Sequence, residues 1–258
     1  MKELKQKIID KIKNEQGGVP TFSDNYAMFL IDNSKDKPAS ELDLFEKNYL
    51  KQERFVDYND NPVTDSSFVN RFQFSQGLTD CLKWKGKPIF KTVYDMAIIQ
   101  MLLWELQPKT IIEIGSGNGS SAEYMKDIMA MYNVDCKIFS FDIRNKDQGI
   151  SDNTINFLHC DCNDVQTLNK IDYTVLPHPW LIVEDSHVNV FGVLEFLNTF
   201  SSEGDYFYVE DIDFRKRIDL EKFLKLDNFK LDLKYLNYFG KNMTCAKNGI
   251  FKKMALEA

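Results

Sequence analysis

The chain has 258 residues, of which 43% are hydrophobic and 28% charged, as in a globular protein with a sizeable core. Its net charge of −7 and pI near 5.1 argue against nucleic acid or an anionic membrane as the main partner. No apolar run approaches the length that spans a bilayer, and the start lacks the basic-then-apolar order of a signal peptide. The five cysteines show no CxxC spacing, so we expect a reduced, cytoplasmic protein without a zinc site.

The first third of the chain is its least regular part. The lysine-rich start has apolar residues at helical spacing and predicts a helix over Lys2–Asn14, which the glycines and the proline that follow would end. A second helix is predicted over Ser40–Lys51, before the acidic loop Asp57–Pro62. We interpret residues 1–85 as a helical segment attached to the core domain. Cap, substrate lid and oligomer contact remain open as its role.

Strands and helices alternate from residue 84 onward. The turn Trp84–Pro88 leads into a strongly apolar helix, Val93–Leu106, which Pro108 stops. The strands predicted next are Thr110–Glu113, Lys137–Asp142, Ile155–Asp161, Trp180–Asp185 and Gly204–Asp211. The predicted helices are Ser120–Ala130, Val190–Phe200 and Leu220–Leu226, and two β-rich segments, Phe229–Tyr238 and Asn248–Lys253, follow. This order predicts an α/β, Rossmann-like fold with a mostly parallel sheet, helices on both faces and an antiparallel C-terminal edge.

A glycine-rich turn follows the first of these strands. Gly115, Gly117 and Gly119 stand at alternate positions, and a helix with a small, polar start comes next. Glycine permits positive φ and lets a ligand approach the backbone, while the helix N-terminus holds an anionic group such as a carboxylate. The dinucleotide fingerprint would have its third glycine where Ser120 stands. The pattern Glu-x-Gly-x-Gly-x-Gly, which begins at Glu113, instead resembles the first motif of class I S-adenosylmethionine (SAM) methyltransferases.

Each later strand of the predicted sheet ends in an acid. The acids are Asp142, Asp161, Glu184 with Asp185, and Glu210 with Asp211. Ligands bind at the carboxyl ends of the strands in such sheets, and acids there are costly unless a ligand or metal takes their charge. Asp142 is placed to accept hydrogen bonds from ribose hydroxyls, and Asp161 with Cys162 lies where an adenine would sit. For both acids a solvated loop position is the alternative.

The acids of the fourth and fifth strands form a second group. Oxygen-only ligands suit Mg²⁺ or a similar ion, which chelates two substrate oxygens and lowers the pKa of a hydroxyl. His187 follows the fourth strand closely and is expected to face the same edge of the sheet. It is therefore a candidate general base, with a helix cap or a structural imidazole as the alternative.

From Trp84 to Lys253 the chain resembles the cephalosporin hydroxylase/rhamnosyl O-methyltransferase family, whose members have the SAM-dependent methyltransferase fold. Several separate motifs in the right order carry this likeness. They are Trp84-Lys-Gly-Lys-Pro-Ile-Phe-Lys91, Leu103-Trp-Glu-Leu-Gln-Pro-Lys-Thr-Ile-Ile-Glu113, Leu181-Ile-Val-Glu-Asp-Ser-His187, Glu203-Gly-Asp-Tyr-Phe-Tyr-Val-Glu-Asp211, Phe239-Gly-Lys-Asn-Met-Thr244 and Asn248-Gly-Ile-Phe251. Residues 1–80 show no such likeness.

The resemblance implies SAM and Mg²⁺ as cofactors. In this family and its macrolide-sugar relatives three acids bind Mg²⁺, and a His three residues after the first acid is the proposed base. Carried over by position, the metal ligands are Glu184, Glu210 and Asp211, and the base is His187. The first ligand is usually Asp, so Glu184 with Asp185 beside it leaves that ligand open. The cofactor contacts expected on all these grounds are Glu113, Gly115, Ser116, Gly117, Asp142, Ile143, Asp161, Cys162 and Glu184.

The resulting hypothesis is a SAM-dependent, Mg²⁺-assisted O-methyltransferase for a hydroxyl of a sugar or secondary metabolite in natural-product biosynthesis. Its domain would span residues 86–258, its partner would be a small hydroxylated molecule, and family likeness favours a homo-oligomer. One alternative is a degenerate methyltransferase fold kept as a binding or assembly subunit, which would bind SAM without transferring its methyl group. The other is an NAD(P)-linked reductase, against which the missing third glycine and the strand-end acids count.

Overall fold

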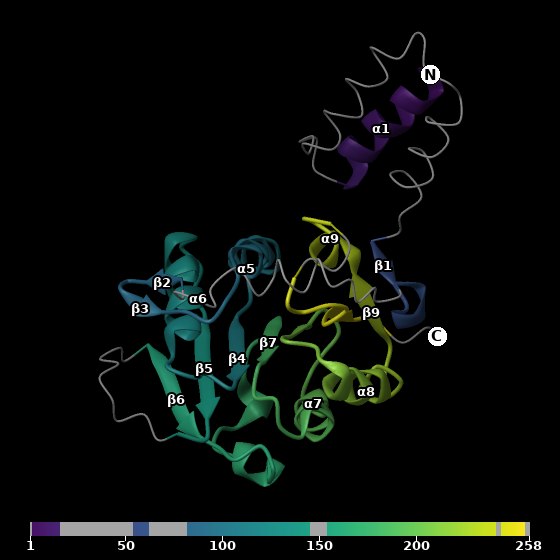
Figure 1. Cartoon of the computed structure of the whole chain (residues 1–258). Helices are drawn as coiled ribbons and strands as arrows, with labels where there is room; N and C mark the ends of the chain where they lie inside the picture. Colours follow the sequence, from purple (N-terminus) through teal and green to yellow (C-terminus); the bar gives the residue numbers. More distant parts are fainter. Residues whose placement is uncertain (1, 16–53, 62–81, 145–153, 241–243, 256–258) are drawn as a thin grey trace. The chain divides into compact units, whose positions relative to one another are not determined.

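The computed structural model describes residues 2–15, 54–61, 82–144, 154–240 and 244–255 (Figure 1). Contacts divide the chain into two units, Met1–Glu53 and Arg54–Ala258. The first unit contains α1 (Lys2–Glu15), which confirms the first predicted helix. The helix predicted over Ser40–Lys51 lies outside the described residues. The role of this segment as cap, lid or oligomer contact stays a prediction.

The second unit is built on a mixed sheet. Its described strands are eight in the order β1-β9-β10-β8-β7-β4-β5-β6. Five of them run parallel, namely β4 (Thr110–Ile114), β5 (Lys137–Asp142), β6 (Ile155–His159), β7 (Trp180–Glu184) and β8 (Tyr206–Val209). The others are β10 (Ile250–Lys253), antiparallel to both β8 and β9 (Phe229–Asp232), and β1 (Phe55–Val56), antiparallel to β9. The predicted mostly parallel sheet with an antiparallel C-terminal part is confirmed.

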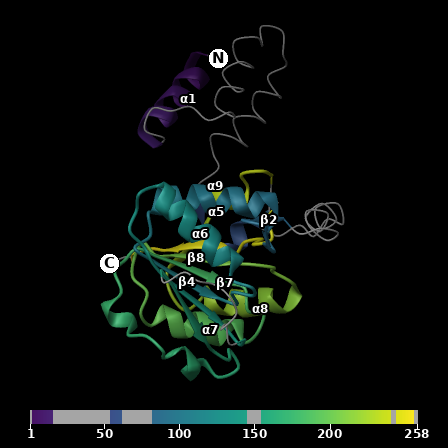
Figure 2. The ribbon, with the colours of Figure 1, turned by 90° about the vertical axis from the view of Figure 1, so that its left-hand side faces the viewer.

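Helices cover both faces of this sheet (Figure 2). One face carries α5 (Val93–Leu106), α6 (Ser120–Met131) and the short α9 (Leu233–Leu236); the other carries α7 (Val190–Asn198) and α8 (Phe214–Phe223). Smaller elements are the hairpin of β2 (Lys83–Trp84) with β3 (Lys87–Pro88) and the 3-10 turns η1 (Tyr58–Asp60), η2 (Val165–Leu168) and η3 (Tyr173–Val175). Among the described residues no helix is long and apolar enough to cross a membrane.

The strand order fixes where a ligand binds. The chain leaves β4 toward β5 and β6 on one side, and it then returns to the other side of β4 to form β7 and β8. Ligands of such sheets bind at the carboxyl ends of the strands where the order reverses, here between β4 and β7. Burial of the apolar interiors holds this arrangement, since every residue of β4, β7 and β8 is buried.

Two predicted elements differ from the structure because of capping aspartates. The segment Phe229–Tyr238 is a strand only in its first four residues, since the Asp232 side chain accepts a hydrogen bond from the Lys234 amide and starts α9. The helix expected over Leu220–Leu226 begins earlier, because the Asp213 carboxylate accepts from the amides of Arg215 and Lys216 (both 2.9 Å). This earlier start matters for the site, since it brings Lys216 into α8.

An edge strand from residues before 85 joins the sheet. Arg54 precedes β1, donates to Asp232 (Nη2–Oδ2 3.0 Å) and also contacts Glu105 of α5. Tyr206 donates its hydroxyl to the same aspartate (3.0 Å). The contacts therefore divide the chain at 53/54, whereas the sequence predicted a boundary at 85/86. Two-residue strands such as β1 carry too little periodicity to be recognised from sequence.

Candidate active site

The glycine turn after β4 packs against the end of β7. Gly115 has φ +91°, and its amide and that of Ser116 donate to the carbonyl of Phe141 in β5 (2.8 and 3.0 Å). A Cβ atom at Gly115 would lie 2.5 Å from the backbone carbon and oxygen of Asp185. Glycine is needed here both for its conformation and for this close approach.

Replacing Gly115 by Ala is therefore expected to destabilise the fold and to weaken nucleoside binding. The control is Gly204→Ala, because Gly204 has φ +95° but nothing within 4 Å of its added Cβ. In both variants the new alanine must adopt a left-handed backbone conformation, which costs about 1–2 kcal/mol of stability. Only Gly115→Ala adds a steric term of about 1–3 kcal/mol. Urea denaturation measures the difference, and equal losses in the two variants would contradict the packing argument.

Asp142, at the end of β5, is an ionised carboxylate beside the turn. Its Oδ2 accepts from the Gly117 amide (2.7 Å), and its Oδ1 accepts from the backbone amide and Nε of Arg144 (2.9 and 3.1 Å). Burial opposes ionisation, but these hydrogen bonds outweigh it and lower the pKa of Asp142. Oδ2 accepts only one of these hydrogen bonds and has a second lone pair, so it could accept a further hydrogen bond from a ribose hydroxyl, as predicted.

Glu113 supports the glycine turn from within the sheet. It is buried, and its carboxylate accepts hydrogen bonds from Ser121, at the start of α6, and from Ser140 of β5 (2.5 Å). These contacts fix α6 and β5 to β4 around the turn. Both Glu113 oxygens are thus already bonded to serines, which favours a supporting role over direct contact with a cofactor.

The remaining predicted cofactor contacts differ in accessibility. Ile143 is exposed, whereas Ser116 and Cys162 are buried. The Asp161 carboxylate accepts from Asn163 (amide and Nδ2, both 3.0 Å), so the side chain turns into its own loop. The Sγ atoms of Cys160 and Cys162 lie 3.9 Å apart, and all four described cysteines are free thiols.

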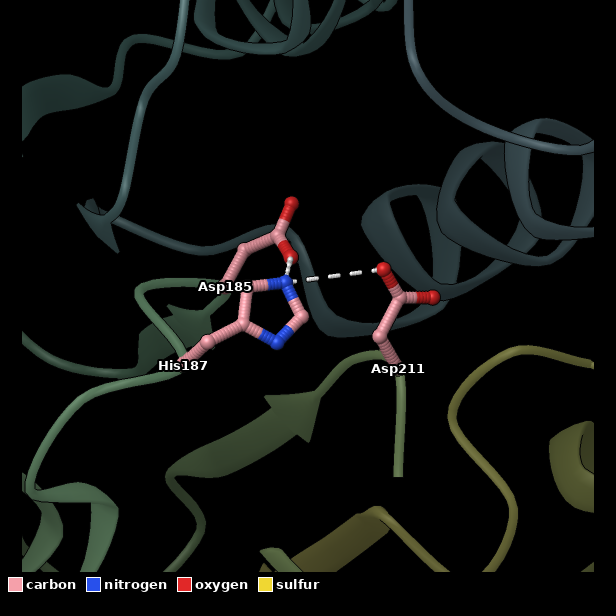
Figure 3. Close-up of side chains that lie close together, drawn as sticks. All are labelled: Asp185, His187 and Asp211. Carbon is pink, nitrogen blue, oxygen red and sulfur yellow. Dashed lines mark ion pairs between the residues drawn. The ribbon is translucent and has the colours of Figure 1, made fainter. Parts of the chain in front are cut away.

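The acids after β7 and β8 meet at His187 (Figure 3). The His187 Nε2 lies 3.4 Å from Asp185 Oδ1 and 3.6 Å from Asp211 Oδ2. Single ligand atoms of these three side chains lie within 4.8 Å of one another. His187 and Asp211 both have positive φ (60° and 49°), a conformation that non-glycine residues rarely adopt outside sites where it is imposed.

Glu184 does not join this cluster. It is fully buried; its Oε1 accepts from the amide and hydroxyl of Ser186 (2.9 and 2.7 Å), and its Oε2 lies 2.9 Å from Lys216 Nζ. Lys216 also donates to the backbone carbonyl of Glu210 (2.7 Å). Side chains of adjacent strand residues point to opposite faces, so Glu184 faces α8 whereas Asp185 faces the other side.

A second buried lysine accounts for Glu210. Lys91, between β3 and α5, places its Nζ 2.7 Å from Glu210 Oε2 and 3.3 Å from Asp185 Oδ2. Burial opposes its charge, but attraction to Glu210 and Asp185 prevails and raises the pKa of Lys91 well above its ordinary value. Lys91 is therefore an ammonium group buried among carboxylates.

Burial raises the pKa of Glu210 well above its ordinary value, since the single Lys91 contact does not fully offset the loss of water and the repulsion from Asp185. Its Oε1 is buried and has no hydrogen-bond partner among the described residues. The hydrogen bond to Asp185, opposed by burial, raises the pKa of His187. A cation beside these acids would relieve their repulsion, so the oxygen-rich set fits Mg²⁺.

Sequence reasoning missed three buried residues of this region. Lys91 and Lys216 are the counter-ions just described. Asp95 of α5 accepts from the Tyr208 hydroxyl (2.9 Å) and the Cys245 amide (3.1 Å), and so ties α5 to β8. The excess of strand-end acids signals that buried cations exist, but nothing local distinguishes these two lysines from exposed ones.

The other two histidines lie outside the cluster. His159 is exposed at the end of β6. His178 precedes β7, at the opposite end of that strand, and its Nδ1 lies 2.9 Å from both carboxylate oxygens of Asp205. Of the three histidines in the chain, His187 alone stands beside the strand-end acids of β7 and β8.

The strand order, the glycine turn and the strand-end acids define a Rossmann-like protein of the class I methyltransferase type. The family described as Rhamnosyl O-methyltransferase/CmcI matches residues 76–222, more than half of the chain. The chain belongs to this family, as the sequence motifs predicted.

Individual relatives agree with this assignment. The rhamnosyl O-methyltransferase of Mycobacterium leprae (strain TN) is 29% identical over 135 residues, 50% of this chain and 59% of that protein. Its counterpart in Mycobacterium tuberculosis (strain ATCC 25618 / H37Rv) is 28% identical over 136 residues, 50% of this chain and 56% of that protein. The matched part thus spans little more than half the length of these relatives.

Solved structures give the same fold. A CmcI structure with Mg and SAM aligns with a TM-score of 0.59 and 25% identity, over 87% of this chain and 100% of that one. An apo structure of CmcI aligns equally well, with a TM-score of 0.59 at 24% identity. These matches confirm the predicted fold class.

Proposed function

We propose that this chain is a SAM-dependent O-methyltransferase, assisted by Mg²⁺, that methylates a hydroxyl of a small molecule. The observation that carries the proposal is the contact between the glycine turn and the acid cluster. The backbone of Gly115 packs so closely on Asp185 that an added Cβ would lie 2.5 Å from it. A nucleoside held at the turn and Asp142 would therefore lie next to His187 and its two acids.

Membership of the family supports the choice of cofactors. Mg and SAM are present in the CmcI structure of the same fold. When bound, SAM supplies the methyl group, and a divalent ion supplies positive charge that favours an ionised hydroxyl. In this chain the turn with Asp142 would hold the nucleoside, and carboxylates at the ends of β7 and β8 would hold the ion.

His187 is assigned as the base that takes the hydroxyl proton. Its side chain is half exposed (52%), so a substrate can reach it, and Asp185 and Asp211 flank its Nε2. The hydroxyl proton would pass to Nε2, and the hydroxyl oxygen would bond to the methyl carbon as the carbon–sulfur bond of SAM breaks and S-adenosylhomocysteine leaves. Because Asp185 favours the protonated ring, it would stabilise the imidazolium that results.

The contacts favour Asp185 over Glu184 as the first metal ligand. Glu184 is neutralised by Lys216 on the α8 side of the sheet, whereas Asp185 Oδ1 faces His187 and Asp211. The proposed set is therefore Asp185, Glu210 and Asp211. The competing set, carried over by position from the family, has Glu184 in place of Asp185 as the first ligand.

Calorimetric titration with S-adenosylhomocysteine (SAH) tests the cofactor class. Wild-type protein is expected to bind, and Asp142→Asn is expected to weaken binding by about 10- to 100-fold, since hydrogen bonds to a charged group contribute about 1.5–3 kcal/mol. Asp172→Asn is the matched control, because Asp172 is an exposed cap of η3. Failure of the wild type to bind SAH would overturn the proposal and favour the reductase alternative.

The acceptor is proposed to be a sugar or secondary metabolite, as in natural-product biosynthesis. The support is the family name and the relatives named as rhamnosyl O-methyltransferases. The proposal also includes a homo-oligomer, on the ground of family likeness. It includes a cytoplasmic location, on the ground of the free thiols. Incubation with labelled SAM and a panel of hydroxylated glycosides tests the acceptor class. SAH binding without transfer to any of them would favour the binding-subunit alternative.

A further inference from the structure

Lys91 is a cation built into the acid cluster. Its side chain is 3% exposed, and its Nζ lies 2.7 Å from Glu210 Oε2 and 3.3 Å from Asp185 Oδ2. Burying an ammonium group is costly unless opposite charges compensate it. The lysine comes from the loop before α5, whereas the two acids follow β8 and β7, so their meeting is a tertiary arrangement.

The lysine engages one oxygen of each acid and leaves the other available. On Asp185 the second oxygen, Oδ1, faces His187 (3.4 Å). On Glu210 the second oxygen, Oε1, is buried and has no hydrogen-bond partner among the described residues. If Asp185 and Glu210 are ligands, an ion would bind through these two oxygens, with His187 giving up its contact to Asp185 Oδ1, while Lys91 keeps the other two.

The charges of the strand-end acids and their two lysines balance around one divalent ion. Lys216 pairs with Glu184, and Lys91 pairs with Glu210 and Asp185. With Asp211, four carboxylates thus share two ammonium groups. Two negative charges remain when all four acids are ionised and His187 is neutral, and a divalent cation beside them would favour and neutralise this state.

We propose that Lys91 is a resident counter-cation that stays beside the bound ion and sets the affinity of the site for it. This proposal rests on the proposed function, since it assumes that Asp185, Glu210 and Asp211 hold a divalent ion. Lys91 shares two of the three ligands, so its charge weakens their attraction for the ion. A lysine that only braced the ligands would have the opposite effect, because its removal would loosen the site.

The test is calorimetric titration with MgCl₂ alone on wild type, Lys91→Met and Lys91→Gln. Removing a unit charge a few ångströms from the ion is expected to tighten binding by about tenfold or more. Lys91→Arg keeps the charge and is expected to bind Mg²⁺ like the wild type. Lys87→Met is the matched control, since Lys87 is a more exposed lysine of β3 that pairs with Glu123. Lys91→Gln retains a hydrogen-bond donor for Glu210 and serves if Lys91→Met does not fold.

The outcomes separate this inference from the proposed function. Tighter binding in both neutral variants supports it, as does binding that appears only in those variants. Weaker binding in them than in the wild type overturns it and assigns Lys91 a bracing role. If neither wild type nor neutral variants bind Mg²⁺, the inference is also overturned, while SAH binding reports separately on the methyltransferase assignment.

Discussion

Replacing Asp185 by Asn is expected to remove Mg²⁺ binding, whereas Glu184→Gln leaves it in place. Asp185 Oδ1 faces His187 and lies in the cluster with Asp211, while the Glu184 carboxylate is buried against Lys216. Loss of a charged ligand should lower the Mg²⁺ affinity by at least about 100-fold. This is the upper end of the loss seen when a residue that only hydrogen-bonds to a metal ligand is removed. Calorimetric titration with MgCl₂ on both variants measures the difference.

Glu184→Gln has a different expected effect, on stability. It leaves the Lys216 ammonium buried without its counter-charge, which costs about 3–5 kcal/mol when one partner of a buried ion pair is removed. The double variant Glu184→Gln/Lys216→Met removes both charges and should regain much of this loss in urea denaturation. Loss of Mg²⁺ binding in Glu184→Gln with retention in Asp185→Asn would restore Glu184 as the first ligand.

Replacing His187 by Ala is expected to lower kcat by about 10²–10⁴-fold, the usual contribution of a general base. The SAH affinity should change by less than about threefold, because the imidazole would act on the acceptor hydroxyl rather than on the nucleoside. The measurement combines turnover with an identified acceptor and SAH titration of the same preparation.

His159→Ala is the matched control for this experiment. His159 is exposed at the end of β6, outside the acid cluster, so turnover should stay at the wild-type level. An unchanged turnover number in His187→Ala would refute its role as base. A parallel fall in Mg²⁺ affinity would instead indicate that the imidazole is a metal ligand.

The fold followed from patterns that neighbouring residues set. Apolar runs with β-branched residues marked the five parallel strands, and Pro108 and the glycines marked where elements begin and end. The predicted element boundaries were wrong where a single aspartate caps a helix. Asp213 starts α8 before the predicted helix, and Asp232 starts α9 inside a predicted strand.

The sequence predicted which acids lie in the candidate site, but not which lysine pairs with each acid. Strand ends in a parallel sheet meet at one edge, so the sequence brought Glu184, Asp185, Glu210 and Asp211 into one region. It also singled out Asp142 and the glycine turn, which the structure places together at the carboxyl ends of β5 and β4. It gave no sign of Lys91 or Lys216.

By itself, the sequence determined the α/β class, the order of the five parallel strands and the longer helices of the second unit, the family and the edge of the sheet that carries the acids. Only the tertiary structure decided which acid is neutralised and which faces His187. Adjacent residues at the end of β7 point to opposite faces, and each face brings its own lysine, Lys216 from α8 and Lys91 from the loop before α5. Charge pairing between distant elements depends on how they pack, and local sequence patterns carry no record of that packing.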